Sequence, residues 1–259
     1  MKKMLKSMWL IINLKAILIV FLSLILTYLC IVFKIKADFS LTLIGIAIVF
    51  PVVFSIGEAY KRRESALAYY ANLKAHGRSL YLASRDWMDN MESAQIEELR
   101  LLLRDILLTA REMFQGDRNE SEKLENLIYK KFSDLSRKLK EFRSHGLTPG
   151  EMSRVNQYQS KMMEAFENMK HIYQYRTPRS LRAYGRIFTY LVPIVYAPYF
   201  AFVAHDSLDV LSFIMPVLFT LVLVGLDNIQ NHLENPFDLI GEDDVKINAE
   251  EFAERLKII

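Results

Sequence analysis

Four carboxylates in the C-terminal tail are the residues whose type and spacing come nearest to a chemical site. They are Asp238, Glu242, Asp243 and Asp244. They follow Asn235-Pro236, and since proline disfavours helix at the preceding residue, we expect them in a loop. Carboxylates and backbone carbonyls are the ligands that Ca²⁺ takes, although this spacing matches no EF-hand loop. Three interpretations of these carboxylates stay open. The carboxylates form a tail clasp that packs near the membrane-proximal helices, a solvated acidic turn, or a partner for basic residues near a membrane.

Other residue types that carry chemistry are scattered. Cys30 is the one cysteine, so no disulfide forms within the chain. Nine glycines leave no glycine-rich phosphate loop. No two histidines share a helix at metal-ligand spacing; they are His76, His145, His171, His205 and His232. These patterns indicate neither an enzyme nor a bound cofactor.

An apolar stripe runs through the segment GIAIVFPVVFSIGEAYKRR, which starts at Gly45. Ile46, Phe50 and Phe54 recur at every fourth place, which on a helix puts them on one narrow face about 6 Å apart. Nearly every neighbour is also apolar, so some stripe must exist. The residues alone therefore favour lipid contact or helix packing.

The elements that carry these residues are apolar segments long enough to cross a bilayer. Four windows contain no charged residue: Ala16–Phe33, Leu41–Gly57, Ile187–Ala204 and Val210–Leu226. Each approaches the length that a helix needs to span about 30 Å of hydrocarbon. Charged residues make up 24% of the 259-residue chain, so four such windows predict a membrane protein with four transmembrane helices.

Basic residues predict the topology of these helices. Lysines precede the first window, and Lys61, Arg62 and Arg63 follow the second. The approach to the third window carries four arginines, and the 204–209 loop carries no Lys or Arg. The positive-inside bias therefore puts both termini and the middle segment in the cytoplasm. The net charge of +3 reflects these positions and does not indicate nucleic-acid binding.

This topology divides the chain into four parts. Residues 1–57 hold the first membrane hairpin, 58–186 a helical cytoplasmic domain, 187–226 the second hairpin and 227–259 a cytoplasmic tail. No segment alternates in the way that strands do, so the predicted fold class is all-α.

Helix signals subdivide the cytoplasmic segment. The second membrane helix is expected to continue to Trp87, and a second helix runs from Glu92 to Gln115. Asn119 is the predicted cap of a third helix with an apolar stripe. That stripe comprises Leu124, Ile128, Phe132, Leu135, Leu139 and Phe142. Thr148-Pro149-Gly150-Glu151 is typical of a capping box that opens a fourth helix.

Three stretches resemble the bestrophins, in particular the shorter prokaryotic bestrophin-like proteins. They are the Gly45–Arg63 segment with its Ala59-Tyr60-Lys61-Arg62 signature, TPRSLRAYGRIFTYLVPIVYAPYF before and within the third window, and GLDNIQNHLENPFD in the tail. Their order and spacing match the family over nearly the whole chain. Ser55 and Gly57 stand where family members often carry Arg and Asn, and Arg63 stands where a tryptophan is common.

The resemblance implies a homopentamer in a bacterial inner membrane, with a central pore for small monovalent ions such as chloride or other anions. Membrane lipid and the permeating ions are the implied partners. A cation-conducting homologue and a non-conducting membrane adaptor remain alternatives. Basic rings at Arg62, Arg63 or Arg176 would favour anions, whereas acidic rings from the tail would favour cations.

In that family, Ile46, Phe50 and Phe54 match the hydrophobic neck of the pore. Gln174 or Tyr175, just before Thr177-Pro178, matches its cytoplasmic constriction. With the stripe facing the pore, Ile48 and Val52 are expected to face lipid. Close packing on the opposite side is expected to use Gly45, Ser55 and Gly57.

Overall fold

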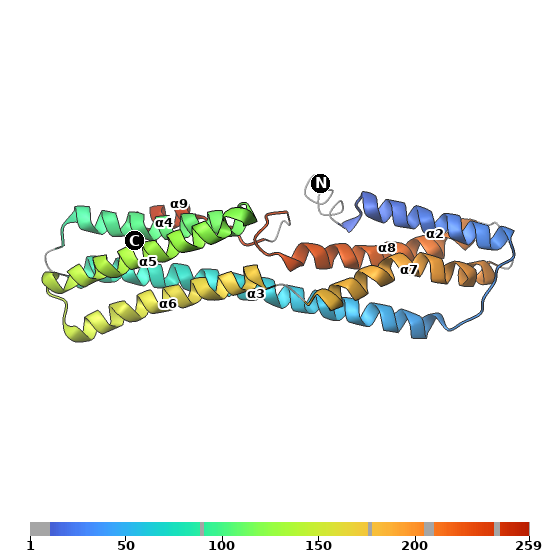
Figure 1. The fold of residues 1–259 in the computed structure, drawn as a ribbon, viewed down its shortest axis with the longest axis horizontal. Coiled ribbons are helices and arrows are strands. Elements are labelled where there is room, and N and C mark those ends of the chain that lie inside the picture. The colour runs from blue at the N-terminus through green and yellow to red at the C-terminus, as the bar shows by residue number, and fades with distance from the viewer. Residues whose placement is uncertain (1–10, 89–90, 176–177, 205–209, 241–243, 259) are drawn as a thin grey trace. The chain divides into compact units, whose positions relative to one another are not determined.

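The computed structural model describes residues 11–88, 91–175, 178–204, 210–240 and 244–258, and no strand occurs among them. The chain separates into two compact units (Figure 1). The apolar-helix unit comprises Met1–Arg62, Arg176–Asn235 and Ile240–Glu242. The bundle unit comprises Arg63–Tyr175, Pro236–Leu239 and Asp243–Ile259. The prediction of an all-α fold is confirmed for the described residues.

The apolar-helix unit contains α2 (Leu14–Val32), α7 (Arg179–Val203), α8 (Val210–Glu234) and the N-terminal part of α3 (Leu41–Asp86). α2, α7 and α8 pack on one another. The buried stripe of α2 includes the small polar residues Ser23 and Thr27 one turn apart. Small residues let membrane helices approach closely, and they serve that purpose here.

Three described helices are long and apolar enough to cross a membrane. They are Leu14–Val32, Arg182–Val203 and Ser212–Glu234, and each overlaps a predicted window. The remaining predicted window, Leu41–Gly57, is not among these three. It is helical as the start of α3, and its crossing of a membrane stays a prediction.

The bundle unit contains the rest of α3 with α4 (Ser93–Gln115), α5 (Ser121–Glu141), α6 (Pro149–Gln174) and α9 (Ala249–Ile258). The predicted continuation of the second membrane helix into the following segment is confirmed, since α3 has 46 residues without interruption. Five of the six residues predicted for the apolar stripe of α5 and the turn after it are buried; they are Ile128, Phe132, Leu135, Leu139 and Phe142. Leu124 is partly buried against the same core.

Local capping explains where these helices begin. The Thr148 hydroxyl accepts from the Glu151 N–H, and the Glu151 carboxylate accepts from the Thr148 N–H, so the predicted capping box is confirmed. The prediction for Asn119 was wrong. A 3₁₀ turn, Arg118–Glu120, precedes α5, and the Asp117 side chain accepts from the Asn119 N–H. Asp117 therefore caps this 3₁₀ turn, and α5 itself begins after Glu120, which makes no side-chain capping hydrogen bond.

The tail returns to the bundle unit after α8 ends before Asn235-Pro236, as predicted. Phe237 is fully buried, and its ring stacks on Phe114 with centroids 4.7 Å apart. The Val245 N–H donates to the Pro236 carbonyl at 2.7 Å and closes the loop between them. The tail therefore contributes to the core of the bundle unit.

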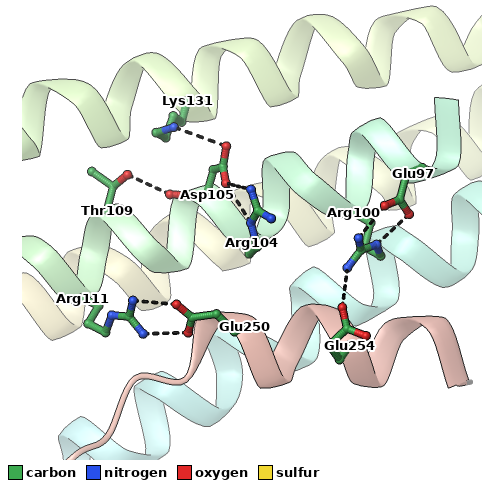
Figure 2. A network of polar contacts seen from close by, with 9 residues as sticks. All are labelled: Glu97, Arg100, Arg104, Asp105, Thr109, Arg111, Lys131, Glu250 and Glu254. Carbon is green, nitrogen blue, oxygen red and sulfur yellow. Dashed lines mark hydrogen bonds and ion pairs between the residues drawn. The ribbon is translucent and has the colours of Figure 1, made fainter. Parts of the chain in front are cut away.

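Polar contacts hold α9 against α4 (Figure 2). Arg111 donates to both carboxylate oxygens of Glu250 at 2.7 Å, and Arg100 lies 3.8 Å from Glu254. Exposed ion pairs stabilise little, but the two-pronged geometry of the Arg111 pair favours one position of α9.

Replacing Phe237 by alanine should lower the free energy of unfolding of the bundle unit by about 3–5 kcal/mol, because the fully buried ring leaves a cavity beside Phe114. Unfolding of the detergent-solubilised chain in denaturant measures this. Leu239→Ala, at a half-exposed side chain of the same loop, is the matched control and should change stability by less than about 0.5 kcal/mol. Equal effects of both substitutions would contradict the role assigned to Phe237.

Candidate functional site: an exposed apolar face on α3

The N-terminal part of α3 has two apolar faces, and the rest of the chain buries one of them. Ile48 and Val52 are each 3% exposed. Ile46, Phe50 and Phe54 are 60%, 70% and 57% exposed. The three residues of the predicted neck therefore share a face that is directed away from the rest of the chain.

The buried face packs on α7 and α8. Ile48 clusters with Val192 and Tyr196 of α7 and with Leu223 of α8. Val52 lies beside Gly185, where an added Cβ would come within 3.5 Å of it. The expectation that Ile48 and Val52 face lipid was therefore wrong: they fill the interior of the subunit.

The small residues near the stripe divide in the same way. Ser55 is buried on the inner face, as expected for close packing. Gly57 is exposed, and a Cβ at Gly45 or Gly57 would meet nothing within 4 Å. Within one chain the expectation of close packing thus holds for Ser55, and at the two glycines it stays a prediction.

Pro51 interrupts the backbone hydrogen bonds of α3 beside the stripe. A proline has no N–H, so the carbonyl four residues earlier, that of Ala47, loses its partner within the helix. The Tyr184 hydroxyl of α7 donates to this carbonyl at 3.1 Å. One side chain thus satisfies the carbonyl that Pro51 frees and joins α7 to α3 at the level of the stripe.

A polar network that the sequence analysis did not find joins α2 to α8. Lys15 donates to Asp227 at 2.6 Å, and the Asp227 side chain is 6% exposed. Asn228 donates to the Ile11 carbonyl at 2.6 Å and accepts from Asn13 at 3.2 Å. The polar pair Asp227-Asn228, directly after an uncharged window, was the sequence signal for this network. Lys15, the partner of Asp227, lies 212 positions away in the chain, so no local pattern joins the two.

Two arginines of the apolar-helix unit, Arg62 and Arg182, lie near the buried carboxylate of Glu234. Arg182 lies 2.9 Å from Glu234, whose side chain is 7% exposed. Burial lowers the pKa of Arg62, Glu234 opposes this effect and Arg182 adds to it. Lys61, in contrast, is exposed and donates to Glu58 at 2.8 Å. Arg62 is thus turned toward the subunit interior, and Arg176 lies outside the described residues.

The residues proposed for a cytoplasmic constriction lie at the C-terminal end of α6. Gln174 is the last residue of that helix, is exposed, and donates to Glu125 at 3.4 Å. Tyr175 is exposed, with its ring 4.8 Å from that of His171. Both side chains lie at the surface of the single chain, and their role in a constriction stays a prediction.

The proposed tail clasp is described at two of its four positions. Asp238 and Asp244 are partly buried in the bundle unit, whereas Glu242 and Asp243 lie outside the described residues. In the part of the chain that the structure describes, no group of three or more His, Cys, Asp or Glu residues could hold a metal ion. The clasp remains a prediction.

Solved structures share this architecture. A bacterial bestrophin homologue from Klebsiella pneumoniae with a single substitution is 14% identical, with 94% of this chain and 98% of that chain covered and a TM-score of 0.74. Another structure of a Klebsiella pneumoniae bestrophin homologue has a TM-score of 0.75 at 14% identity, covering 93% and 96%. A membrane protein with a proline-to-alanine substitution matches at 15% identity and TM-score 0.75, covering 94% and 98%.

No protein-family model and no curated protein sequence matches the chain. The structural likeness covers nearly the whole chain, so the chain has a bestrophin-like fold. The resemblance of the three sequence stretches is thereby confirmed at the level of the fold. The three apolar helices and the fold of solved membrane proteins together support an integral membrane protein.

Tyr184→Phe should lower the stability of the apolar-helix unit by about 1 kcal/mol, because the Ala47 carbonyl loses its donor. Pro51→Ala restores an N–H at position 51, so Tyr184→Phe should have little effect in that background. A double-mutant cycle on the unfolding free energy in mixed detergent micelles measures the coupling. Additive effects of the two substitutions would show that the hydroxyl does not compensate for Pro51.

Proposed function

We propose that this chain is the subunit of a bestrophin-like homopentameric ion channel that conducts small monovalent ions passively, with chloride or other anions as the permeating species. It would lie in a bacterial inner membrane with both termini in the cytoplasm. Leu41–Gly57 would be its second membrane span, which brings the total to four. The bestrophin-like fold supports this function, and the family that the sequence resembles supplies the pentamer.

The exposed face with Ile46, Phe50 and Phe54 is the observation that carries the proposal. Lipid would cover such a face on a lone subunit. In a pentamer with α3 nearest the axis, five copies of each residue would form three stacked apolar rings. A narrow apolar bore admits water and ions only at a free-energy cost, which falls steeply as the bore widens. These rings would therefore act as the gate.

The remaining predicted residues take places along the same pathway. Gln174 or Tyr175 would form the cytoplasmic constriction, since both are exposed at the end of α6. Asp238, Glu242, Asp243 and Asp244 would form a clasp in the tail. Neither apolar rings nor a neutral constriction selects the charge of an ion, so selectivity must arise from charged residues elsewhere.

Assembly and conduction provide the test of the function. The detergent-solubilised protein should have about five times the subunit mass of 30.2 kDa. In planar bilayers under a KCl gradient, the reversal potential should lie near the chloride equilibrium potential. A potential near that of potassium would indicate the cation-conducting alternative. A monomer or dimer without current would support the membrane adaptor and overturn the channel.

Alanine at Phe50 or Phe54 should raise leak current and open probability, because it widens the bore and removes apolar surface from its wall. The ratio of anion to cation permeability should change little, since no charge is altered. Single-channel recording in bilayers measures both quantities.

Two matched variants test the assignment of the face. Phe21→Ala removes a ring of similar exposure from α2 and should leave the current unchanged. Ile48→Ala removes a buried side chain and should reduce stability by roughly 2–5 kcal/mol without added leak. If Ile48→Ala leaks while Phe50→Ala and Phe54→Ala conduct like the parent, the pore face has been misassigned.

A further inference from the structure

A basic cavity of about 90 Å³ lies between α3 and the start of α9 in the bundle unit. Four cationic side chains line it: Lys74, Arg78, Lys246 and Arg255. Tyr70, Asn248, Glu251 and Phe252 complete the wall. Glu251 is the one carboxylate of this lining, so the cavity has an excess of three positive charges.

Close packing of α9 on α3 forms the cavity. A Cβ at Gly77 would lie 3.2 Å from the Phe252 ring, so the glycine lets this ring approach the α3 backbone. The Asn248 N–H donates to the Tyr70 hydroxyl at 2.9 Å just before α9 begins. Arg111 and Glu250 hold α9 from the side of α4 (Figure 2). These contacts therefore fix the distance between α3 and α9 on the two sides of the cavity.

The positive charges of the cavity are incompletely compensated. Glu251 accepts from Arg255 at 2.5 Å and from the Asn248 amide at 3.1 Å. The Lys74 ammonium lies 4.2 Å from the centre of the Tyr70 ring. The described residues provide no carboxylate within ion-pair distance of Lys74, Arg78 or Lys246.

Arg78 and Lys74 both carry positive charge that no nearby carboxylate of the described residues pairs with. The Arg78 Nε atom is buried without a hydrogen-bond partner in the described structure, an arrangement that costs free energy. Burial lowers the pKa of Lys74, nearby Arg78 lowers it further, and Glu251 opposes both effects. The Tyr70 hydroxyl accepts from Asn248 and keeps its own hydrogen to donate. These three donors lie on α3, and Lys246 and Arg255 bring two further cations from the tail and α9.

We propose that this cavity binds a phosphate-class oxyanion, either free or as the exposed phosphate of a larger molecule. A guanidinium matches the tetrahedral oxygens of phosphate with two parallel hydrogen bonds, and an ammonium adds a point charge. The volume of about 90 Å³ exceeds what a single water molecule needs and leaves room for one such group. Because the site lies within the bundle unit, the inference does not rest on the proposed channel function.

Calorimetric titration of the full-length protein in detergent tests the proposal, with inorganic phosphate as probe and ionic strength held constant with potassium chloride. Phosphate should bind, and Lys74→Gln with Arg78→Gln should weaken it about tenfold or more, because charge-assisted hydrogen bonds are lost. Lys123→Gln with Lys130→Gln removes the same charge from exposed positions on α5 and should leave binding unchanged.

Two further variants keep the test decisive. Lys246→Gln changes an exposed tail residue and should weaken binding even if the double variant fails to fold. Arg78→Lys keeps the charge but lacks the planar fork, so it should bind more weakly than the parent and more tightly than Arg78→Gln.

The source of the phosphate is distinguished by parallel titrations. Binding of inorganic phosphate or glycerol 3-phosphate would indicate a soluble ligand. Binding only to vesicles that contain phosphatidic acid, with the same variant dependence, would indicate a lipid headgroup. Absence of binding to all three probes, or equal weakening by the Lys123 and Lys130 control, would overturn the site.

Discussion

Burial of Ile48, Val52 and Ser55 against α7 and α8 determines which way α3 faces. Each residue turns a helix by about 100°, so burial of these three residues fixes the direction of the neighbouring side chains of α3 within the apolar-helix unit. The same arc continues with Ala59, Ala66, Tyr70, Leu73 and Leu80, which are all buried. In each unit taken by itself, α3 therefore has a buried face at helical period. Ile46, Phe50 and Phe54 stay exposed because they occupy the other side.

The tail shows the same dependence on α3. Phe237 enters the bundle core beside Phe114, and α9 then packs Phe252 on the glycine of the inner arc, Gly77. Lys74 lies three positions before that glycine, and Arg78 lies one position after it. The basic cavity therefore forms because α9 must approach α3 closely at Gly77, and the neighbouring cations are carried into the contact.

The sequence predicted features that depend on local patterns. The α5 stripe, the Thr148 capping box and the end of α8 before Pro236 follow from residues within a few positions of one another. The orientation of Ile48 and Val52 could not be predicted, because an almost wholly apolar segment has no polar face to contrast with. The Lys15–Asp227 pair and the Tyr184 hydrogen bond to Ala47 join distant segments, and no single-sequence pattern links them. The cavity likewise needed α9, whose packing against α3 no motif predicted.

On the proposed pore, the gate and the charge filter are different residues. The exposed stripe contains no charge, so it can set the cost of wetting but discriminates little between anions and cations. Lys61 lies fifteen positions after Ile46 and so falls near the same face, yet Glu58 pairs with it at 2.8 Å and offsets its charge. Arg62 is directed toward Arg182 and Glu234. A ring of Lys61 and Glu58 pairs would carry little net charge, so a modest change in this one pair would shift the preference between anions and cations while the apolar gate stayed the same.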